Sequence, residues 1–340
     1  MNQRPVSLSD VAKAAGVSLA TASRAMNSAY GVAPKTRDRV LAAAARLDFV
    51  ASPDARTLAS GGSSRRVALI VSHINRWFFG QMVDGIERIT AGADIDLLLY
   101  HVDDEEHRRG FFERLPARRK VEAMVIVAFP VDEGESRRLN LMGVDIIAAG
   151  GQSAHYPHVC IDDYAASRQA VDHLTSRGHR RIAMLSAHEP AVPDWPSFPG
   201  RQRGYFDALA AVGVEPEPGW TREVDWGEAA AARATDELLD SDAAPTAIFA
   251  HSDELAMGAM GAILARGLRV PEDIALIGID DHPLAAPLGL STVRQPVREQ
   301  GEIVGRMVLQ ALGIEGDGID PRSVIVPTEL IARRSTDVRR

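Results

Sequence analysis

The 340-residue chain contains a single cysteine, Cys160, and this scarcity excludes two ways of stabilising a fold. One thiol can form neither an internal disulfide nor a cysteine-rich zinc site. Cys160 lies in the apolar run 158–161, which predicts a buried core thiol rather than a reactive one. No apolar run approaches membrane-spanning length, and the first residues lack the apolar stretch of a secretory signal. We therefore expect a cytoplasmic protein without a membrane partner.

The sequence motifs of common enzyme and cofactor sites are missing as well. No Gly-x-Gly-x-x-Gly follows a predicted strand, and no phosphate-binding loop ends in Gly-Lys-Ser/Thr. The chain has neither a Gly-x-Ser-x-Gly nucleophile elbow nor a His-Glu-x-x-His zinc motif, and its ten histidines are scattered. The sequence therefore predicts no catalytic residues, no metal site and no cofactor.

Positive charge is concentrated at the start of the chain. Residues 1–66 contain ten Lys and Arg against four Asp and Glu, a net charge of +6. Because the whole chain carries −8, the remainder must carry −14. A basic head on an acidic body is expected if the head meets phosphate and the body does not.

Two short helices around a tight turn are predicted in residues 8–27. Apolar residues fall at helical spacing between Leu8 and Ala15. Gly16 tolerates the positive φ of a sharp helix exit, and Ser18 can cap the next helix by accepting a backbone N–H. A second helix so placed can enter the major groove of DNA while the first crosses the backbone.

A third helix is predicted from Ala33 to Arg46, with Pro34 at its first position. Its apolar residues would pack onto the first two helices, which favours a helix-turn-helix head over residues 1–50. The alternative is a small helical bundle whose polar residues form only a solvated face.

The remainder of the chain follows a different pattern. Residues 51–64 are rich in Gly, Ser and Pro and indicate a hinge. From residue 65 to 340, short apolar runs alternate with amphipathic helical stretches, and the theme restarts near residue 181. Continuous apolar strands separated by helices predict parallel sheets covered on both faces. Two α/β units are therefore expected, with a ligand cleft between them.

Several short motifs follow one another along the chain. The head carries Asp10-Val11-Ala12, Gly16-Val17-Ser18 and Ser23-Arg24. The body carries further motifs at increasing residue numbers: Ile161-Asp162-Asp163, Gly178-His179-Arg180-Arg181-Ile182, Arg201-Gln202-Arg203-Gly204-Tyr205, Val270-Pro271-Glu272-Asp273, Gly278-Ile279-Asp280-Asp281 and Ser291-Thr292-Val293-Arg294-Gln295-Pro296. By these motifs the chain resembles the LacI/GalR (lactose-repressor) family of bacterial transcription regulators over essentially its whole length.

The resemblance implies an all-α helix-turn-helix head and an α/β body of two doubly wound parallel-sheet lobes, like a periplasmic binding protein. The first lobe is expected at about 65–161 and 293–322, and the second at about 162–292 and 323–340. It also implies a homodimer that binds a pseudo-palindromic double-stranded DNA operator, acting as a repressor. A small molecule held between the lobes would control operator affinity allosterically.

The resemblance assigns DNA contacts residue by residue. Leu19 and Ala20 would face base edges, where apolar side chains favour a thymine methyl, and Arg24 would read guanine, worth roughly 1–3 kcal/mol of discrimination. Phosphate contacts are expected from polar and basic residues of the head: Ser18, Thr21, Ser23, Asn27, Lys35 and Arg37. In the hinge, Leu58 matches the leucine that enters the minor groove and bends the duplex, and Ala55, in the same possible helical turn, is expected there with it. The alternatives are a solvated helix face and, for Leu58, an apolar contact with the body.

Effector residues carry over in the same way. Arg201 matches an arginine that reaches across the cleft, Asp280 an acid that binds hydroxyls, and Trp226 an aromatic that stacks on a ring. Further contacts are expected from residues near strand ends: Phe78, Phe79, Trp77, Asp163 and Ser252. These groups suit a sugar or sugar derivative, because orienting polar groups stand on an apolar wall.

Several departures from the family pattern leave the chemistry of this effector open. His73, Arg76 and His251 stand where other residue types are common in the family, which keeps a carboxylated or phosphorylated ligand possible. The effector can be an inducer or a corepressor, and an inducer is the commoner case for sugars. Two other functions are less consistent with the sequence. An enzyme built on the α/β units is rejected because the catalytic motifs are missing, and the basic head argues against a ligand-binding protein whose head docks onto another protein.

Overall fold

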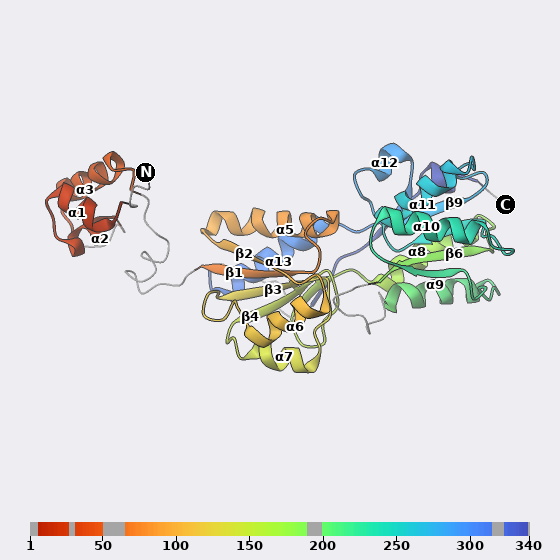
Figure 1. The fold of residues 1–340 in the computed structure, drawn as a ribbon, viewed down its shortest axis with the longest axis horizontal. Coiled ribbons are helices and arrows are strands. Elements are labelled where there is room, and N and C mark those ends of the chain that lie inside the picture. Colours follow the sequence, from red (N-terminus) through yellow and green to blue (C-terminus); the bar gives the residue numbers. More distant parts are fainter. Residues whose placement is uncertain (1–5, 27–30, 50–64, 189–198, 315–322, 339–340) are drawn as a thin grey trace. The chain divides into compact units, whose positions relative to one another are not determined.

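The computed structural model describes residues 6–26, 31–49, 65–188, 199–314 and 323–338. It divides into two compact units, residues 1–65 and 66–340, which are described separately (Figure 1). In the part of the chain so described, no helix is both long enough and apolar enough to cross a membrane.

The first unit contains three short helices: α1 (Leu8–Ala15), α2 (Leu19–Met26) and α3 (Pro34–Arg46). A capping box between Ser7 and Asp10 begins α1, and Gly16, at φ 64°, ends it. Ser18 accepts a hydrogen bond from the backbone N–H of Thr21 at 3.1 Å, as expected of a helix cap. Small buried side chains, among them Ala22 of α2, let the helices pack closely. The structure confirms the predicted helix-turn-helix head.

The second unit begins with a lobe built on one sheet. Its strands are β1 (Arg66–Val71), β2 (Asp96–His101), β3 (Ala123–Val127), β4 (Asp145–Ala149), β5 (His158–Cys160) and β11 (Ser323–Ile325). They lie in the order β11-β5-β4-β3-β1-β2, and all are parallel. The helical segments of this lobe are α5 (Trp77–Thr90), η1 (Ala91–Ala93), α6 (Glu105–Arg114), α7 (Glu133–Asn140) and α13 (Val297–Ala311).

Alternating side chains of β1 explain why helices cover both faces of this sheet. Val67 and Leu69 pack with residues of α5 and α13, whereas Ala68 and Ile70 pack with residues of α6 and α7. Figure 1 shows the two helix pairs on opposite faces. Successive side chains of a strand point to opposite faces, so an apolar strand without polar alternation needs cover on each side.

The second lobe repeats this plan. Its strands are β6 (Ile182–Ala187), β7 (Thr221–Val224), β8 (Ala247–Ala250), β9 (Ala275–Asp280), β10 (Ser291–Arg294) and β12 (Glu329–Ile331). They lie in the order β12-β10-β9-β8-β6-β7, with β12 antiparallel to β10. The helical segments are α8 (Asp163–Ser176), α9 (Pro199–Ala211), α10 (Glu228–Leu239), α11 (Asp253–Ala265), α12 (Ala285–Leu288) and η2 (Arg334–Thr336). The structure confirms the predicted class, a helical head with two doubly wound lobes.

The chain passes between the lobes after β5, after β10 and after β11. The second passage follows Arg294, because β10 pairs with β9. The third follows Ile325, because β11 pairs with β5. These passages lie two residues beyond the expected limit at 292 and three residues beyond the expected limit at 322. The reason is that each short strand is hydrogen-bonded to a strand of the lobe that the chain is about to leave.

In each lobe the strand order reverses beside the first strand, between β1 and β3 and between β6 and β8. In open parallel sheets, ligands bind outside the carboxyl ends of the strands at such a reversal. The loops that leave these strand ends are therefore where binding residues are expected.

Candidate functional site

A small cavity lies where the strand ends of the two lobes meet. Its lining residues lie at the carboxyl ends of strands, in the loops that follow, or near the starts of helices α5 and α9: Arg76, Phe78, Phe79, Ala128 and Gly150 from the first lobe, Arg201, Trp226, Ser252 and Asp280 from the second, and Gln295 from a passage between them. The cavity holds about 30 Å³. Because one water needs roughly 10–15 Å³, the cavity as it stands has no room for a ring-sized molecule.

Arg201 is the buried cation of this cavity, 5% exposed. Its Nε donates to Oδ1 of Asp163 at 2.7 Å, and its Nη1 donates to the carbonyl oxygen of His251. Burial, reinforced by the charge of Arg201, lowers the pKa of His251 well below its ordinary value. His251 is therefore neutral at pH 7 and adds no positive charge.

Asp280 is the buried acid of the cavity. It ends β9 at φ 135°, and Asp281 follows at φ 59°, so two consecutive non-glycine residues have positive φ. Oδ1 of Asp280 accepts a hydrogen bond from Nε2 of Gln295 at 2.5 Å. Burial raises the pKa of Asp280 to about 6, although Arg201 and Gln295 oppose the rise. The Asp280 carboxyl therefore gives up its proton near neutral pH.

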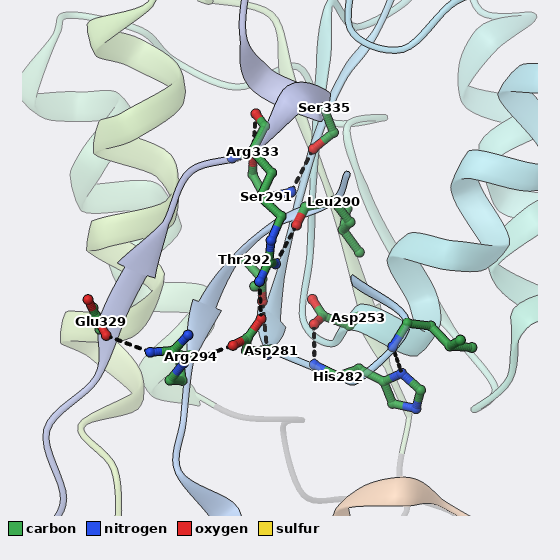
Figure 2. Close-up of polar contacts among 11 residues, drawn as sticks. Asp253, Asp281, His282, Leu290, Ser291, Thr292, Arg294, Glu329, Arg333 and Ser335 are labelled. Carbon is green, nitrogen blue, oxygen red and sulfur yellow. Dashed lines mark hydrogen bonds and ion pairs between the residues drawn. The ribbon is translucent and has the colours of Figure 1, made fainter. Parts of the chain in front are cut away.

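The strained turn after β9 is held by polar contacts outside the cavity (Figure 2). Oδ1 and Oδ2 of Asp281 accept hydrogen bonds from Arg333 at 2.6 Å and from Arg294 at 2.8 Å. The backbone N–H of His282 donates to the buried Asp253 at 2.8 Å. Burial raises the pKa of Asp281, but hydrogen bonds from the two arginines outweigh it and leave the pKa lowered. Asp281 is thus an ionised anchor beside Asp280.

Aromatic rings form the apolar part of the cavity wall. Phe78 and Phe79 meet edge to face with centroids 5.5 Å apart. The guanidinium carbon of Arg76 lies 3.3 Å from the centroid of Trp226, so one face of the indole is covered by this cation. Trp77 instead packs edge-on against His282, with centroids 5.2 Å apart.

Six of the eight residues expected to bind an effector line the cavity: Phe78, Phe79, Arg201, Trp226, Ser252 and Asp280. Trp77 does not, because it faces His282, and Asp163 lies behind Arg201 as its ion-pair partner. Sequence reasoning missed some lining positions and considered one, Arg76, only as a departure from the family pattern that bears on ligand charge; these positions are Arg76, Ala128, Gly150 and Gln295. Three of these directly follow the last residue of a strand, which is a signal that could have found them.

In the head, the residues expected to read bases share the exposed side of α2. Leu19 is 55% exposed, and Ala20 and Arg24 are also exposed, whereas Ala22 and Ala25 are buried. The residues expected at phosphates vary in exposure: Ser18 and Lys35 are exposed, and Thr21, Ser23 and Arg37 are half-buried. Asn27, Ala55 and Leu58 lie outside the described residues.

Comparison with known proteins decides the family. Residues 7–52 match the model of bacterial regulatory proteins, lacI family, and residues 171–336 match a periplasmic binding protein-like domain. The HTH-type transcriptional repressor CytR of Escherichia coli K12 is 30% identical over 333 residues, 97% of this chain and 96% of the relative. This chain belongs to the LacI family.

Solved structures agree with this LacI-family assignment. The Lac repressor dimer bound to operator and the anti-inducer ONPF is 27% identical, with a TM-score of 0.81, covering 98% of this chain and 99% of that one. A transcriptional regulator CelR–cellobiose complex is 28% identical, with a TM-score of 0.69 and coverage of 98% and 100%. This LacI-family chain is a DNA-binding transcriptional repressor with an effector-binding domain. An enzyme is excluded, as is a head that only docks onto protein.

Proposed function

We propose that this repressor acts as a homodimer on a pseudo-palindromic operator, with α2 of each head in the major groove. The arrangement of α2 supports this, because Leu19, Ala20 and Arg24 form an exposed side opposite the buried Ala22 and Ala25. An apolar side chain left in water at a helix start is suited to meet another apolar surface, such as a thymine methyl. Leu58, with Ala55, remains our prediction for the minor-groove wedge of each hinge.

The effector we propose is an uncharged hydroxylated ring, a sugar or sugar derivative. The observation that carries this is the convergence of Asp280, Arg201 and Trp226 on one cavity. Both guanidinium groups of the cavity already bind carboxylates of the chain, Arg201 with Asp163 and Arg76 with Glu254. A carboxylated or phosphorylated ligand would therefore add negative charge where the cations are already neutralised.

Effector and operator would be linked through the population of lobe arrangements in the dimer. A ligand shifts such an equilibrium only by its differential affinity for the two states, and the coupling is reciprocal. An effector that weakens operator binding must bind more weakly to the DNA-bound protein. The direction of this shift, induction or corepression, is an outcome of the measurement below. Because the target is bacterial DNA, we place the repressor in the cytoplasm.

Selection from a random DNA pool by the full-length protein tests the operator proposal. We expect a palindrome whose half-sites are about one helical turn apart. Arg24→Ala should then lose preference at one symmetric base position, whereas Arg46→Ala, an exposed arginine at the end of α3, should keep it. Recovery of no preference, with and without a metabolite mixture, would refute operator reading by this head.

Fluorescence anisotropy on the recovered operator tests the effector proposal. Neutral sugars and their phosphorylated counterparts are titrated against the complex at fixed salt. We expect a neutral member to change operator affinity and Trp226→Ala to abolish that response with DNA binding intact. A response to phosphorylated members alone would contradict the proposed ligand class.

A further inference from the structure

The side chain of Arg76 crosses from the first lobe to the second. Arg76 precedes α5, while Glu254 lies in the first turn of α11. Nε and Nη2 of Arg76 both donate to Oε2 of Glu254, at 2.8 and 2.6 Å, and the backbone N–H of Trp77 donates to Oε1 at 3.3 Å. One carboxylate thus binds a guanidinium and a helix start, where the positive end of the helix dipole also favours an anion.

The pair is shielded from water, because the Arg76 and Glu254 side chains are only 13% and 17% exposed. The Arg76 guanidinium also stacks on Trp226 of the second lobe, 3.3 Å from the ring centroid. Beside it, Trp77 packs against His282 of the second lobe. Salt screens such a buried pair weakly, and removal of one partner leaves the other charge without compensation.

We propose that Arg76 and Glu254 form a latch that holds the lobes closed without an effector, with Arg76 occupying a ring face of Trp226. An effector ring can stack on this face only after Arg76 leaves it. Entry of the effector and opening of the latch would then be one coupled event. The small cavity fits this, since about 30 Å³ admits no ring while the latch is closed. The latch itself rests on the contacts of Arg76 with Glu254 and Trp226, whereas its coupling to effector entry rests on the ring-shaped effector proposed above.

The test measures lobe opening in the effector-free, full-length protein by single-molecule energy transfer between two dyes. Cys160 is buried, and burial together with Asp163 and Asp162 raises its pKa to about 11, so the native thiol should resist labelling. Introduced cysteines replace Glu133 at the start of α7 and Ala229 in the first turn of α10, both exposed and in different lobes. Excess unlabelled protein keeps two labelled copies out of one dimer.

Glu254→Gln removes the charge with little change of shape. We expect one closed population in the unsubstituted protein and a rise of at least about tenfold in the open-to-closed ratio of Glu254→Gln, because it loses charge-assisted hydrogen bonds. Glu302→Gln is the matched control, since Glu302 pairs with Arg88 at 3.6 Å within the first lobe.

Two outcomes would overturn the latch: an open population that already dominates in the unsubstituted protein, or a folded Glu254→Gln with an unchanged ratio. Circular dichroism establishes the fold of each variant. If Glu254→Gln does not fold, Arg76→Lys decides, because a single ammonium group keeps the charge but cannot reproduce the planar stack. An open-to-closed ratio that is unchanged in Arg76→Lys would equally refute the proposal.

Discussion

Arg333 and Asp281 are 52 residues apart in the chain, and their side chains meet at 2.6 Å. Arg333 belongs to the segment that returns from the first lobe after β11, and Asp281 to the turn that places Asp280 in the cavity. Positive φ at both Asp280 and Asp281 is unfavourable for side-chain-bearing residues and persists only where surrounding contacts determine it. The segment that contains Arg333 therefore helps to hold the cavity in shape.

Arg333→Gln should destabilise the body and weaken the effector response together. The substitution removes the bond to Asp281 and the bond from Nη1 to the carbonyl oxygen of Leu290, at 2.8 Å. With both side chains largely buried, we expect a loss of about 2–3 kcal/mol in the free energy of unfolding. Urea denaturation measures it, and exposed Arg334→Gln serves as the control. Equal curves for the two variants would show that the anchor is dispensable.

Gly85→Ala should destabilise the first lobe. Gly85 lies where α5 meets α13, and an added Cβ would be 2.2 Å from the carbonyl oxygen of Arg298. Because backbone must move, we expect a loss of about 2 kcal/mol or more, as for other overpacked sites. Gly80→Ala, in the same helix with no atom within 4 Å of the added Cβ, should instead stabilise by about 0.5–1 kcal/mol. Thermal unfolding of both variants measures these changes in stability. If both substitutions changed stability in the same direction, the prediction would be contradicted.

Arg201→Lys should abolish the effector response despite retaining the charge. One ammonium group cannot bind Asp163 and the His251 carbonyl in the geometry of a planar fork. We expect operator binding to persist, and the free energy of unfolding to fall by about 3 kcal/mol because a buried pair is broken. Anisotropy titrations and urea denaturation give the two readouts. Arg203→Lys, two residues on and exposed, is the control. If Arg201→Lys still responded to the effector, the planar guanidinium of Arg201 would not be required for effector recognition.

Most strands and helices could be predicted from sequence because hydrophobic periodicity is local. The apolar run 67–71 predicts a strand buried on both faces, and β1 confirms it. The latch could not be predicted in this way. Glu254 looks like one of two acids favouring a helix start, and its pairing with Arg76 across 178 residues depends on how the lobes meet. The surroundings of Trp77 are a second case, since its neighbour Phe78 lines the cavity while Trp77 packs against His282.

The pH dependence of stability should change when Asp280 loses its titrating group. Burial raises the pKa of Asp280 from its ordinary 3.8 to about 6, with Arg201 and Arg76 opposing and Glu254 assisting the rise. Between these two pH values the folded chain binds more protons at this site than the unfolded chain does. Stability contributed by the protonated form is therefore complete below pH 3.8 and is lost as the pH rises through about 6.

Urea denaturation of the unsubstituted protein and of Asp280→Asn, from pH 4 to pH 7, measures this contribution. We expect the free energy of unfolding of the unsubstituted protein, relative to the variant, to fall by up to about 3 kcal/mol over that range. The same substitution removes a charge beside the buried Asp253, whose raised pKa changes stability in the same direction. Asp207→Asn, at an exposed carboxylate of α9, controls for loss of one charge. Parallel curves for Asp280→Asn and the unsubstituted protein would show that Asp280 stays ionised in the fold, because a carboxylate without a raised pKa adds no slope between pH 4 and 7.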